Sequence, residues 1–108
     1  MDKADTELLL PKVFGSSRTI IILEILLKNY VQNENSWLNF SDIARHGKLS
    51  TSTSKRIIED LIRKGIVLLR ENTYQSPVKN PERQVQLNSS SKISKELLFF
   101  YQKLRGFM

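Results

Sequence analysis

The sequence predicts an α+β fold that is mostly helical, with four helical segments and one β hairpin. Three observations lead to this prediction. Apolar residues recur at helical spacing in residues 18–31, two shorter segments lie between capping residues and glycines, and two strand-like runs flank a connection that contains prolines. A chain of 108 residues is long enough for one compact domain and too short for two ordinary ones.

The first long helix is predicted over residues 18–31, after an N-terminal arm of residues 1–15. Pro11 and Gly15 interrupt the arm, which has no sustained periodicity and room for one helical turn. Ser16 or Ser17 is the expected N-cap. Apolar residues then nearly encircle the helix, as expected for a central element that packs on several sides.

A second helix is expected to begin at Asn39 or Ser41 and to end near His46, after an apolar patch or short strand at residues 37–40. Gly47 is its predicted stop, because glycine tolerates a positive φ.

The third helix is predicted over residues 51–64. Serines and threonines at 50–54 offer N-caps, and Gly65 is the predicted terminator. Two short helices separated by three or four residues form a helix-turn-helix.

A hairpin and a last helix complete the predicted fold. Residues 66–69 and 83–87 read as two strands, joined by a long connection that contains Pro77 and Pro81. The polar run at 88–91 then caps a C-terminal helix.

The third helix has an apolar face and a basic face when about 100° is allowed per residue. With Ile57 at 0°, the apolar arc centres near about 70°, and Arg56 and Arg63 lie opposite, near about 260° and 240°. Ser54 lies near about 60°, inside the apolar arc, where its hydroxyl needs a backbone partner.

The basic face has the chemistry that reads DNA in the major groove. Arginine pairs bidentately with guanine, so Arg56 is the base-reading candidate. Ser52 and Thr53 suit a base edge or a phosphate, and Thr51 and Lys55 suit phosphates. Further candidate DNA contacts are Arg45 and Lys48 beside this helix, Arg63 on it, and Lys79 and Arg83 on the hairpin.

Two plainer readings of these charges stay open. Lys55 with Glu59, and Arg56 with Asp60, are also spaced as i,i+4 ion pairs on a solvated helix face. Lys79 and Arg83 equally suit an ordinary solvated loop.

The residues Ile43-Ala44, Leu49-Ser50, Ser52-Thr53, Arg56, Ile58, Leu61 and Gly65-Ile66-Val67 together resemble a winged helix-turn-helix transcription regulator. The pattern is closest to the ArsR-like and MarR-like regulators of archaea and bacteria, and it covers about residues 14–104. The sequence departs from the family at Ser54, where valine is preferred, at Gly47, which replaces an apolar residue, and in its longer wing.

The resemblance implies a three-helix core with a β-hairpin wing, in a DNA-binding domain over residues 16–88. It implies double-stranded DNA as the partner, with residues 51–64 in the major groove and the wing, residues 66–87, on the backbone or minor groove. The alternatives are a protein–protein interaction module on the same fold and a nonspecific nucleic-acid-binding protein.

Residues 89–108 form the C-terminal helix, and their spacing indicates self-association. Apolar residues follow one another by four, three, four and three positions in a short heptad-like seam. Packing of this helix against residues 18–31 is the alternative, but the apolar surface is wider than one small domain easily covers. The predicted homodimer interface consists of Ile93, Leu97, Phe100, Leu104 and Phe107.

Composition excludes several other classes of function. The net charge of +6 and pI of about 9.8 favour a polyanionic partner, and residues 45–64 hold six basic and two acidic side chains. Without cysteine, and with His46 as the one histidine, we expect no metal site. We expect no enzyme activity or cofactor, because no catalytic constellation or glycine-rich phosphate loop is present. The apolar runs are too short for a membrane span, and a cytoplasmic location is expected.

Overall fold

The computed structural model describes residues 8–33, 36–72 and 82–107. This part of the chain is α+β and mostly helical, with a small antiparallel sheet. The fold class predicted from the sequence is confirmed at this level. In chain order the elements are α2 (Leu10–Phe14), α3 (Arg18–Gln32), β1 (Leu38–Asn39), α4 (Phe40–Gly47), α5 (Thr51–Arg63), β2 (Val67–Asn72), β3 (Glu82–Leu87) and α6 (Lys92–Phe107).

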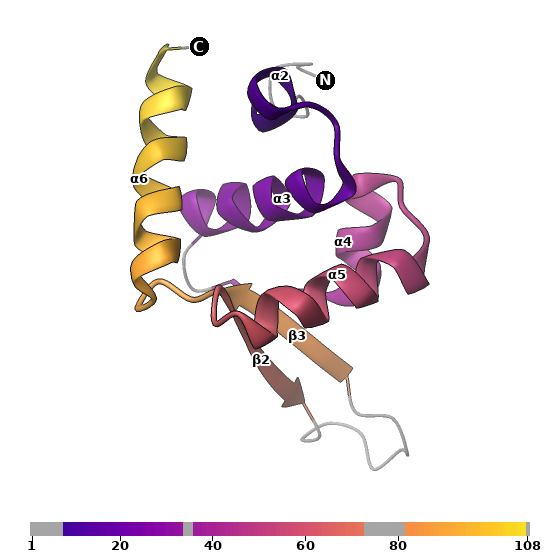
Figure 1. Cartoon of the computed structure of the whole chain (residues 1–108). Helices are drawn as coiled ribbons and strands as arrows, with labels where there is room; N and C mark the ends of the chain where they lie inside the picture. The colour runs from indigo at the N-terminus through magenta and orange to yellow at the C-terminus, as the bar shows by residue number, and fades with distance from the viewer. Residues whose placement is uncertain (1–7, 34–35, 73–81, 108) are drawn as a thin grey trace.

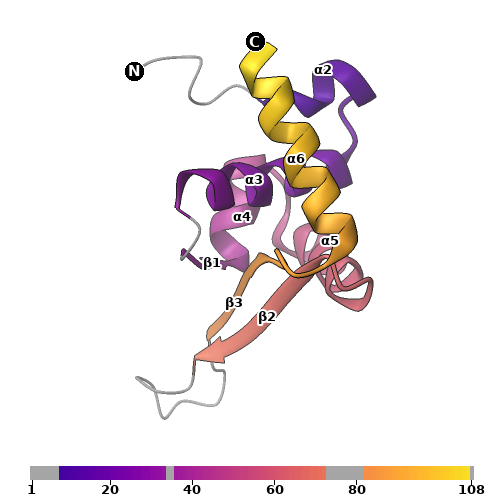
Figure 2. The same cartoon turned by 90° about the vertical axis from the view of Figure 1, so that its left-hand side faces the viewer.

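Helix α3 is the centre of the arrangement. It crosses the middle of the molecule, with α4 and α5 near its first half and α6 beside its other end (Figure 1). The β2–β3 hairpin extends away from the helices, and α6 runs in the opposite direction toward the C-terminus (Figure 2). The hairpin and the end of α6 are therefore presented at opposite ends of the molecule.

Each of the three longer helices before the hairpin starts at a side-chain cap. The Ser17 hydroxyl accepts a hydrogen bond from the Ile20 amide at 3.1 Å, and the Asn39 side chain accepts one from Asp42 at 2.8 Å. The Ser50 hydroxyl accepts one from the Thr53 amide at 3.2 Å. All three caps lie among the residues predicted from the sequence, because short polar side chains satisfy the free amides of a first helical turn.

The end of α4 differs from the prediction in one residue. Gly47 lies within the helix, and Lys48 takes the left-handed conformation with φ of 57°. The prediction that Gly47 adopts the positive φ is therefore wrong. A Cβ on Gly47 would lie 3.2 Å from Ile21 Cγ2 and 3.4 Å from Ile25 Cδ1, so glycine allows α4 to approach α3 closely.

Gly65 ends α5 as predicted, with φ of 77°. The turn leads directly into β2, which pairs antiparallel with β3 in the register Val67 to Leu87 and Leu69 to Val85. Strand β1 pairs with the other edge of β3, so the strand order is β1-β3-β2. The hairpin is confirmed, and its connection at 73–81 lies outside the described residues.

Every described helix and strand except β1 contributes a buried apolar side chain to the core, and Leu38 of β1 packs against it partly buried. Ile22, Ile43, Ile58 and Val85 are fully buried, and together they join α3, α4, α5 and β3. The apolar arc predicted for the third helix is confirmed, because Ile58 and Leu61 are its buried apolar residues. Burial of such side chains is the main source of fold stability.

Glu24 is a buried carboxylate at the centre of a polar network. It is 0% exposed and accepts hydrogen bonds from the amides of Leu9 and Leu10, both at 2.6 Å, and from the Tyr101 hydroxyl at 3.1 Å. Since a buried carboxylate without partners is costly, the three donors explain how the charge is tolerated inside the core. The network ties α2 and α6 to α3.

The start of α6 is fixed to the junction between α5 and β2. The Ser94 hydroxyl donates to the Ile66 carbonyl at 2.9 Å, and the Asn88 side-chain amide donates to the Gly65 carbonyl at 2.9 Å. Helix α6 is thus attached to the rest of the fold at its first turn and again at Tyr101.

None of the helices in the described ranges is both long enough and apolar enough to cross a membrane.

Candidate nucleic-acid interface

The turn between α4 and α5 sets the position of the candidate interface. The Leu49 amide donates to the Ala44 carbonyl at 2.9 Å, and the chain passes from α4 to α5 within residues 48–50. Leu49 packs against the core, and Lys48 points to solvent. The tight turn places the start of α5 on the surface, directly after α4, as the helix-turn-helix prediction requires.

The first two turns of α5 carry an exposed set of hydroxyl and basic side chains, here called the basic surface of α5. Thr51, Ser52, Lys55 and Arg56 are all exposed. Thr53 differs, because it is half-buried and its hydroxyl accepts a hydrogen bond from Ser50 at 2.8 Å. Of the predicted residues on this part of α5, four are free to contact a ligand and Thr53 serves the N-cap.

The ion pairs proposed as the plainer reading of α5 do not form. Asp60 instead binds Lys64 at 2.8 Å and Arg63 at 3.1 Å, and Glu59 lies 3.6 Å from Arg83 of β3. Lys55 and Arg56 consequently have no ion-pair partner in the described ranges. Their charges are left for solvent or for a ligand.

Asp60 titrates below its ordinary range. The hydrogen bond from Lys64 lowers its pKa most, and Arg63 lowers the pKa further through a hydrogen bond and its charge. Asp60 is therefore a carboxylate at neutral pH, and it holds two cations at the end of α5. The first half of α5 carries free cations, and the second half carries paired ones.

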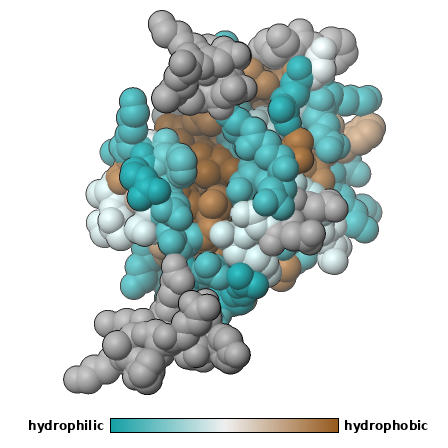
Figure 3. All heavy atoms as spheres, turned by 180° about the vertical axis from the view of Figure 1, so that it is seen from behind, coloured by the Kyte–Doolittle hydropathy of each residue, from teal (hydrophilic) through white to brown (hydrophobic). Residues whose placement is uncertain are grey.

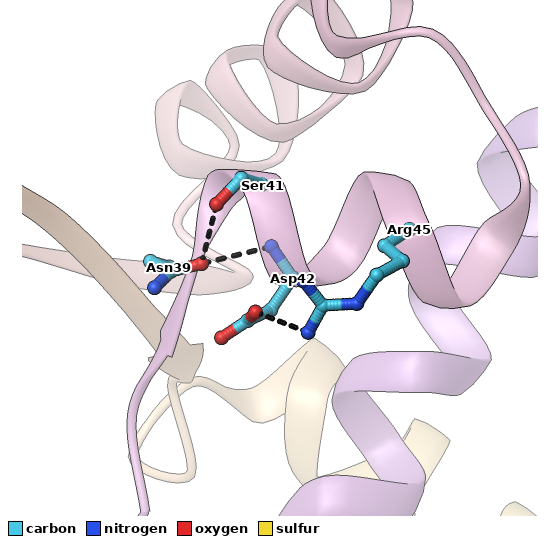
Figure 4. A network of polar contacts seen from close by, with 4 residues as sticks. All are labelled: Asn39, Ser41, Asp42 and Arg45. Carbon is cyan, nitrogen blue, oxygen red and sulfur yellow. Dashed lines mark hydrogen bonds and ion pairs between the residues drawn. The ribbon is translucent and has the colours of Figure 1, made fainter.

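Arg45 on α4 is also paired. Its guanidinium lies 2.6 Å from Asp42, and Asp42 belongs to the capped first turn formed with Asn39 and Ser41 (Figure 4). The pair is exposed and screened by water, so it is weak and a phosphate can compete for the arginine. Arg45 is close to the motif but less available than Lys48.

The hairpin lies against one side of α5. Arg83 on β3 is 3.6 Å from Glu59 and 3.4 Å from Glu71, so the two carboxylates offset its charge. Arg70 on β2 stacks 4.5 Å above the Trp37 ring and donates to Gln84 at 2.8 Å. Lys79, the other predicted hairpin contact, lies outside the described residues.

A different kind of surface lies between α2, α3 and α6. An apolar groove of about 590 Å³ is lined by Phe14, Leu27, Ile93, Phe100 and neighbouring apolar residues, together with Lys92 and Glu96. Phe14 and Phe100 meet with their ring centroids 6.0 Å apart. Large apolar side chains thus remain in contact with water on this side of the monomer.

The predicted seam of α6 is divided by its packing. Ile93 and Phe100 are 54% and 42% exposed, whereas Leu97 and Leu104 pack partly against the core. The side chain of Phe107 lies outside the described residues. Helix α6 therefore packs against α3, as the intramolecular alternative proposes, and also keeps part of its seam exposed.

Seen from behind, the molecular surface is largely hydrophilic. A strip of apolar residues reaches the surface in the middle of this view, between hydrophilic residues on both sides (Figure 3). On this face the apolar residues therefore lie together and are not spread evenly.

Sequence reasoning missed two features beside the predicted residues. Arg18, at the start of α3, lines a polar hollow together with Arg56 and Arg63. Its signal was a basic residue directly after a cap, where acidic residues are usual. The second feature is Glu24, whose hydrogen-bond partners lie 14, 15 and 77 residues away, so no local pattern points to them.

The described residues contain no group of three or more histidine, aspartate or glutamate side chains placed to hold a metal ion. Comparisons with protein-family models, with curated proteins and with solved structures found no match to this chain.

Proposed function

We propose that the protein is a winged helix-turn-helix regulator that binds double-stranded DNA in a sequence-specific manner. In this proposal α5 enters the major groove, the β2–β3 hairpin is the wing, and residues 16–88 form the DNA-binding domain. The observation that carries the proposal is the position of Lys55 and Arg56. Both are exposed and unpaired near the start of α5, directly after the short connection from α4. Recognition helices contact bases with these same first turns.

The electrostatic arrangement supports a polyanionic partner. The first half of α5 has no acidic residue in its first turn, and its dipole adds positive potential there. The acidic residues of α5 lie in its second half, where they are held by Arg63, Lys64 and Arg83. A duplex approaching the first half meets free positive charge and hydroxyl donors.

We further propose that the protein binds DNA as a homodimer through α6 and the apolar groove. A two-fold interface uses the same patch on both copies, so the patch must be complementary to itself, as a patch with a recess and a projection can be. The groove is the recess, and Phe99, 57% exposed on the same helix, is the projection. Two α5 helices held in this way would reach half-sites about 34 Å apart.

Selection of bound fragments from a random duplex pool tests the proposed function directly. We expect an enriched, palindromic site with half-sites about one helical turn apart, and binding that weakens steeply with salt. The selected duplex should bind on the order of 10³-fold or more tightly than a scrambled one. Equal affinity for both would favour the nonspecific nucleic-acid-binding alternative, and no duplex binding at low salt would favour a protein-interaction module.

Sedimentation of the free protein and of its DNA complex tests the dimer. We expect two chains per selected duplex, and we expect Phe99→Ser with Ile93→Ser to shift the free protein toward the monomer. Lys95→Ser, on the exposed surface of the same helix, is the matched control and should leave the association unchanged. A free protein that is already monomeric, with one chain per duplex, would contradict the dimer and leave DNA binding in place.

A further inference from the structure

The charge of Arg18 lies at the end of its helix where a cation is unfavourable. Arg18 is the first residue of α3, whose first turn holds no acidic residue, and a cation there opposes the helix dipole. Arg18 is exposed, and it has no ion pair or hydrogen bond in the part of the chain that the structure describes. The charge of Arg18 is therefore available to a ligand.

Arg18 faces α5 across a polar hollow of about 700 Å³. Arg56 and Arg63 line the hollow from α5, and Ser16 and Thr19 line it from the start of α3. In Figure 1 the first turn of α3 lies above α5, so the hollow joins two elements that are far apart in the sequence. Three guanidinium groups around one hollow suit an anion with several oxygen acceptors, such as a phosphate.

The hollow and the hairpin lie on different sides of the exposed face of α5. The directions around the axis of α5 are counted from Ile57 at 0°. Glu59 contacts Arg83 of the hairpin and projects at about 200°. Asp60 lines the hollow and projects at about 300°. Arg56, near about 260°, projects between them. A duplex that lies across Arg56 therefore meets the hairpin on one side and the hollow on the other.

We infer that this hollow binds a phosphate of the duplex backbone, with Arg18 as a dedicated phosphate contact and Arg63 as a second. The inference rests on the proposed DNA-binding function and adds a contact that lies outside the helix-turn-helix and the wing. The hollow is lined largely by exposed side chains, so it suits one unit of a continuing polyanion better than an enclosed free ion.

Asp60 sets how strongly the hollow attracts a phosphate. Its carboxylate lines the hollow and lies 3.1 Å from Arg63, so in the free protein it offsets part of the guanidinium charge. A phosphate that enters must share Arg63 with Asp60. Removal of the Asp60 charge should therefore strengthen DNA binding, whereas removal of the Arg18 charge should weaken it.

The test is duplex affinity as a function of salt, measured by fluorescence anisotropy with the selected and a scrambled duplex. For Arg18→Gln we expect the slope of log K against log salt to fall in magnitude by about 0.9, the value of one phosphate contact. We expect the same fold loss on both duplexes, because a phosphate carries no sequence information. We expect Asp60→Asn to bind both duplexes more tightly, and Arg18→Lys to recover most of the slope.

Two controls separate this inference from charge effects and from folding. Lys103→Gln removes one positive charge from the C-terminal half of α6, and α6 runs away from α5 toward its C-terminus (Figure 1), so the slope should stay unchanged. The melting temperature of Arg18→Gln should equal or exceed that of the wild type, because an unfavourable dipole interaction is removed. A stabilising role for Arg18 would lower the melting temperature instead.

The possible results distinguish the inference from the function on which it rests. If the wild type binds no duplex at low salt, the proposed function fails. If it binds, but Arg18→Gln matches Lys103→Gln, the function stands and the phosphate contact is overturned. Saturable binding of inorganic phosphate at constant ionic strength, lost in Arg18→Gln while the duplex slope is kept, would assign the hollow to free phosphate and also overturn the inference.

Discussion

The basic surface of α5 and the apolar side of α6 differ in how they are connected to the core. Thr51, Ser52, Lys55 and Arg56 lie on a helix whose other face is packed in the core, and no fold contact depends on the charges of Lys55 and Arg56. On α6, exposed Phe100 is the neighbour of Tyr101, which is buried and bonded to Glu24. Substitutions on the basic surface of α5 should therefore change binding alone, whereas substitutions in the buried network of α6 should change stability first.

Glu24→Ala removes the buried carboxylate and should have the largest effect on stability. The amides of Leu9 and Leu10 and the hydroxyl of Tyr101 would each lose a partner inside the core. Buried donors without partners cost about 1 to 3 kcal/mol each, so we expect the free energy of unfolding to fall by roughly 3 kcal/mol after relaxation. Urea denaturation followed by circular dichroism measures this loss.

Duplex affinity of the same variant shows whether the two regions are independent. Under conditions in which Glu24→Ala is folded, we expect its affinity for a single half-site to equal that of the wild type. Glu24→Gln, which keeps the shape of the side chain and one acceptor, should lose less stability. A stability equal to that of the wild type for Glu24→Ala would show that the network does not hold α2 and α6 in place.

Arg56→Ala tests the contrast from the other side. If Arg56 reads a guanine, we expect a loss of about 1 to 3 kcal/mol of binding free energy at one base position. The free energy of unfolding should stay within about 0.5 kcal/mol of the wild type, because the side chain is exposed and unpaired. Anisotropy on a set of single-base variants of the selected duplex makes the measurement.

Lys79→Ala is the matched control on the hairpin connection. It should weaken all duplexes by a similar factor, as expected for a phosphate contact. Equal losses on selected and random duplexes for Arg56→Ala would remove Arg56 from base reading and place it with the phosphate contacts.

Sequence periodicity predicts which residues of α5 are exposed, but it does not predict the hydrogen-bond network of Glu24. Ile58, Leu61 and Ser54 are buried as the 100° repeat predicts, because one helix turn determines which residues share a face. The role of Glu24 depends on Leu9, Leu10 and Tyr101, and no local pattern shows that these groups meet. Such long-range polar contacts are properties of the folded packing.

The structure also differs from local expectation at Gly47 and in the ion pairs of α5. The backbone freedom of glycine predicts that α4 stops at Gly47. In the structure Gly47 lies inside the helix, and the absence of a Cβ leaves room for the side chains of Ile21 and Ile25. The i,i+4 spacing of Arg56 and Asp60 was also correct, yet Asp60 pairs with Lys64 and Arg63. Spacing shows which pairs are within reach, and the competition among partners decides which of them form.

Tyr101→Phe tests how the stability contributed by the network of α6 depends on pH. Burial raises the pKa of the Tyr101 phenol above its ordinary value of 10.0, and the Glu24 charge and hydrogen bond raise it further. The folded state therefore keeps this proton after the unfolded chain releases it. The contribution to stability is present below about pH 10 and is lost as pH rises above that value.

We expect Tyr101→Phe to cost about 1 to 2 kcal/mol at neutral pH, because Glu24 loses one donor. The difference in unfolding free energy between wild type and variant should then shrink above about pH 10. Chemical denaturation from pH 7 to 11 measures both values, and the variant corrects for the lysines that titrate in the same range. A difference that is constant with pH would contradict the bond to Glu24.

The smallest effect expected distinguishes two buried serines, one in each region. Ser54 on α5 is 0% exposed, and its hydroxyl has no hydrogen-bond partner among the described residues, so the expected backbone partner is not found. Ser94 on α6 is equally buried and donates to the Ile66 carbonyl. We expect Ser54→Ala to stabilise the fold by about 1 kcal/mol and Ser94→Ala to destabilise it by a similar amount.

Thermal and urea unfolding of the two variants compare them directly, since both remove a single hydroxyl from a buried helix position. Duplex affinity of Ser54→Ala should equal that of the wild type, because the side chain faces the core and not the basic surface of α5. A loss of stability in Ser54→Ala would mean that its hydroxyl is satisfied in solution, either by water or by a carbonyl of the preceding turn. Equal and opposite shifts would show that hydrogen bonding, and not burial alone, decides what each buried hydroxyl contributes.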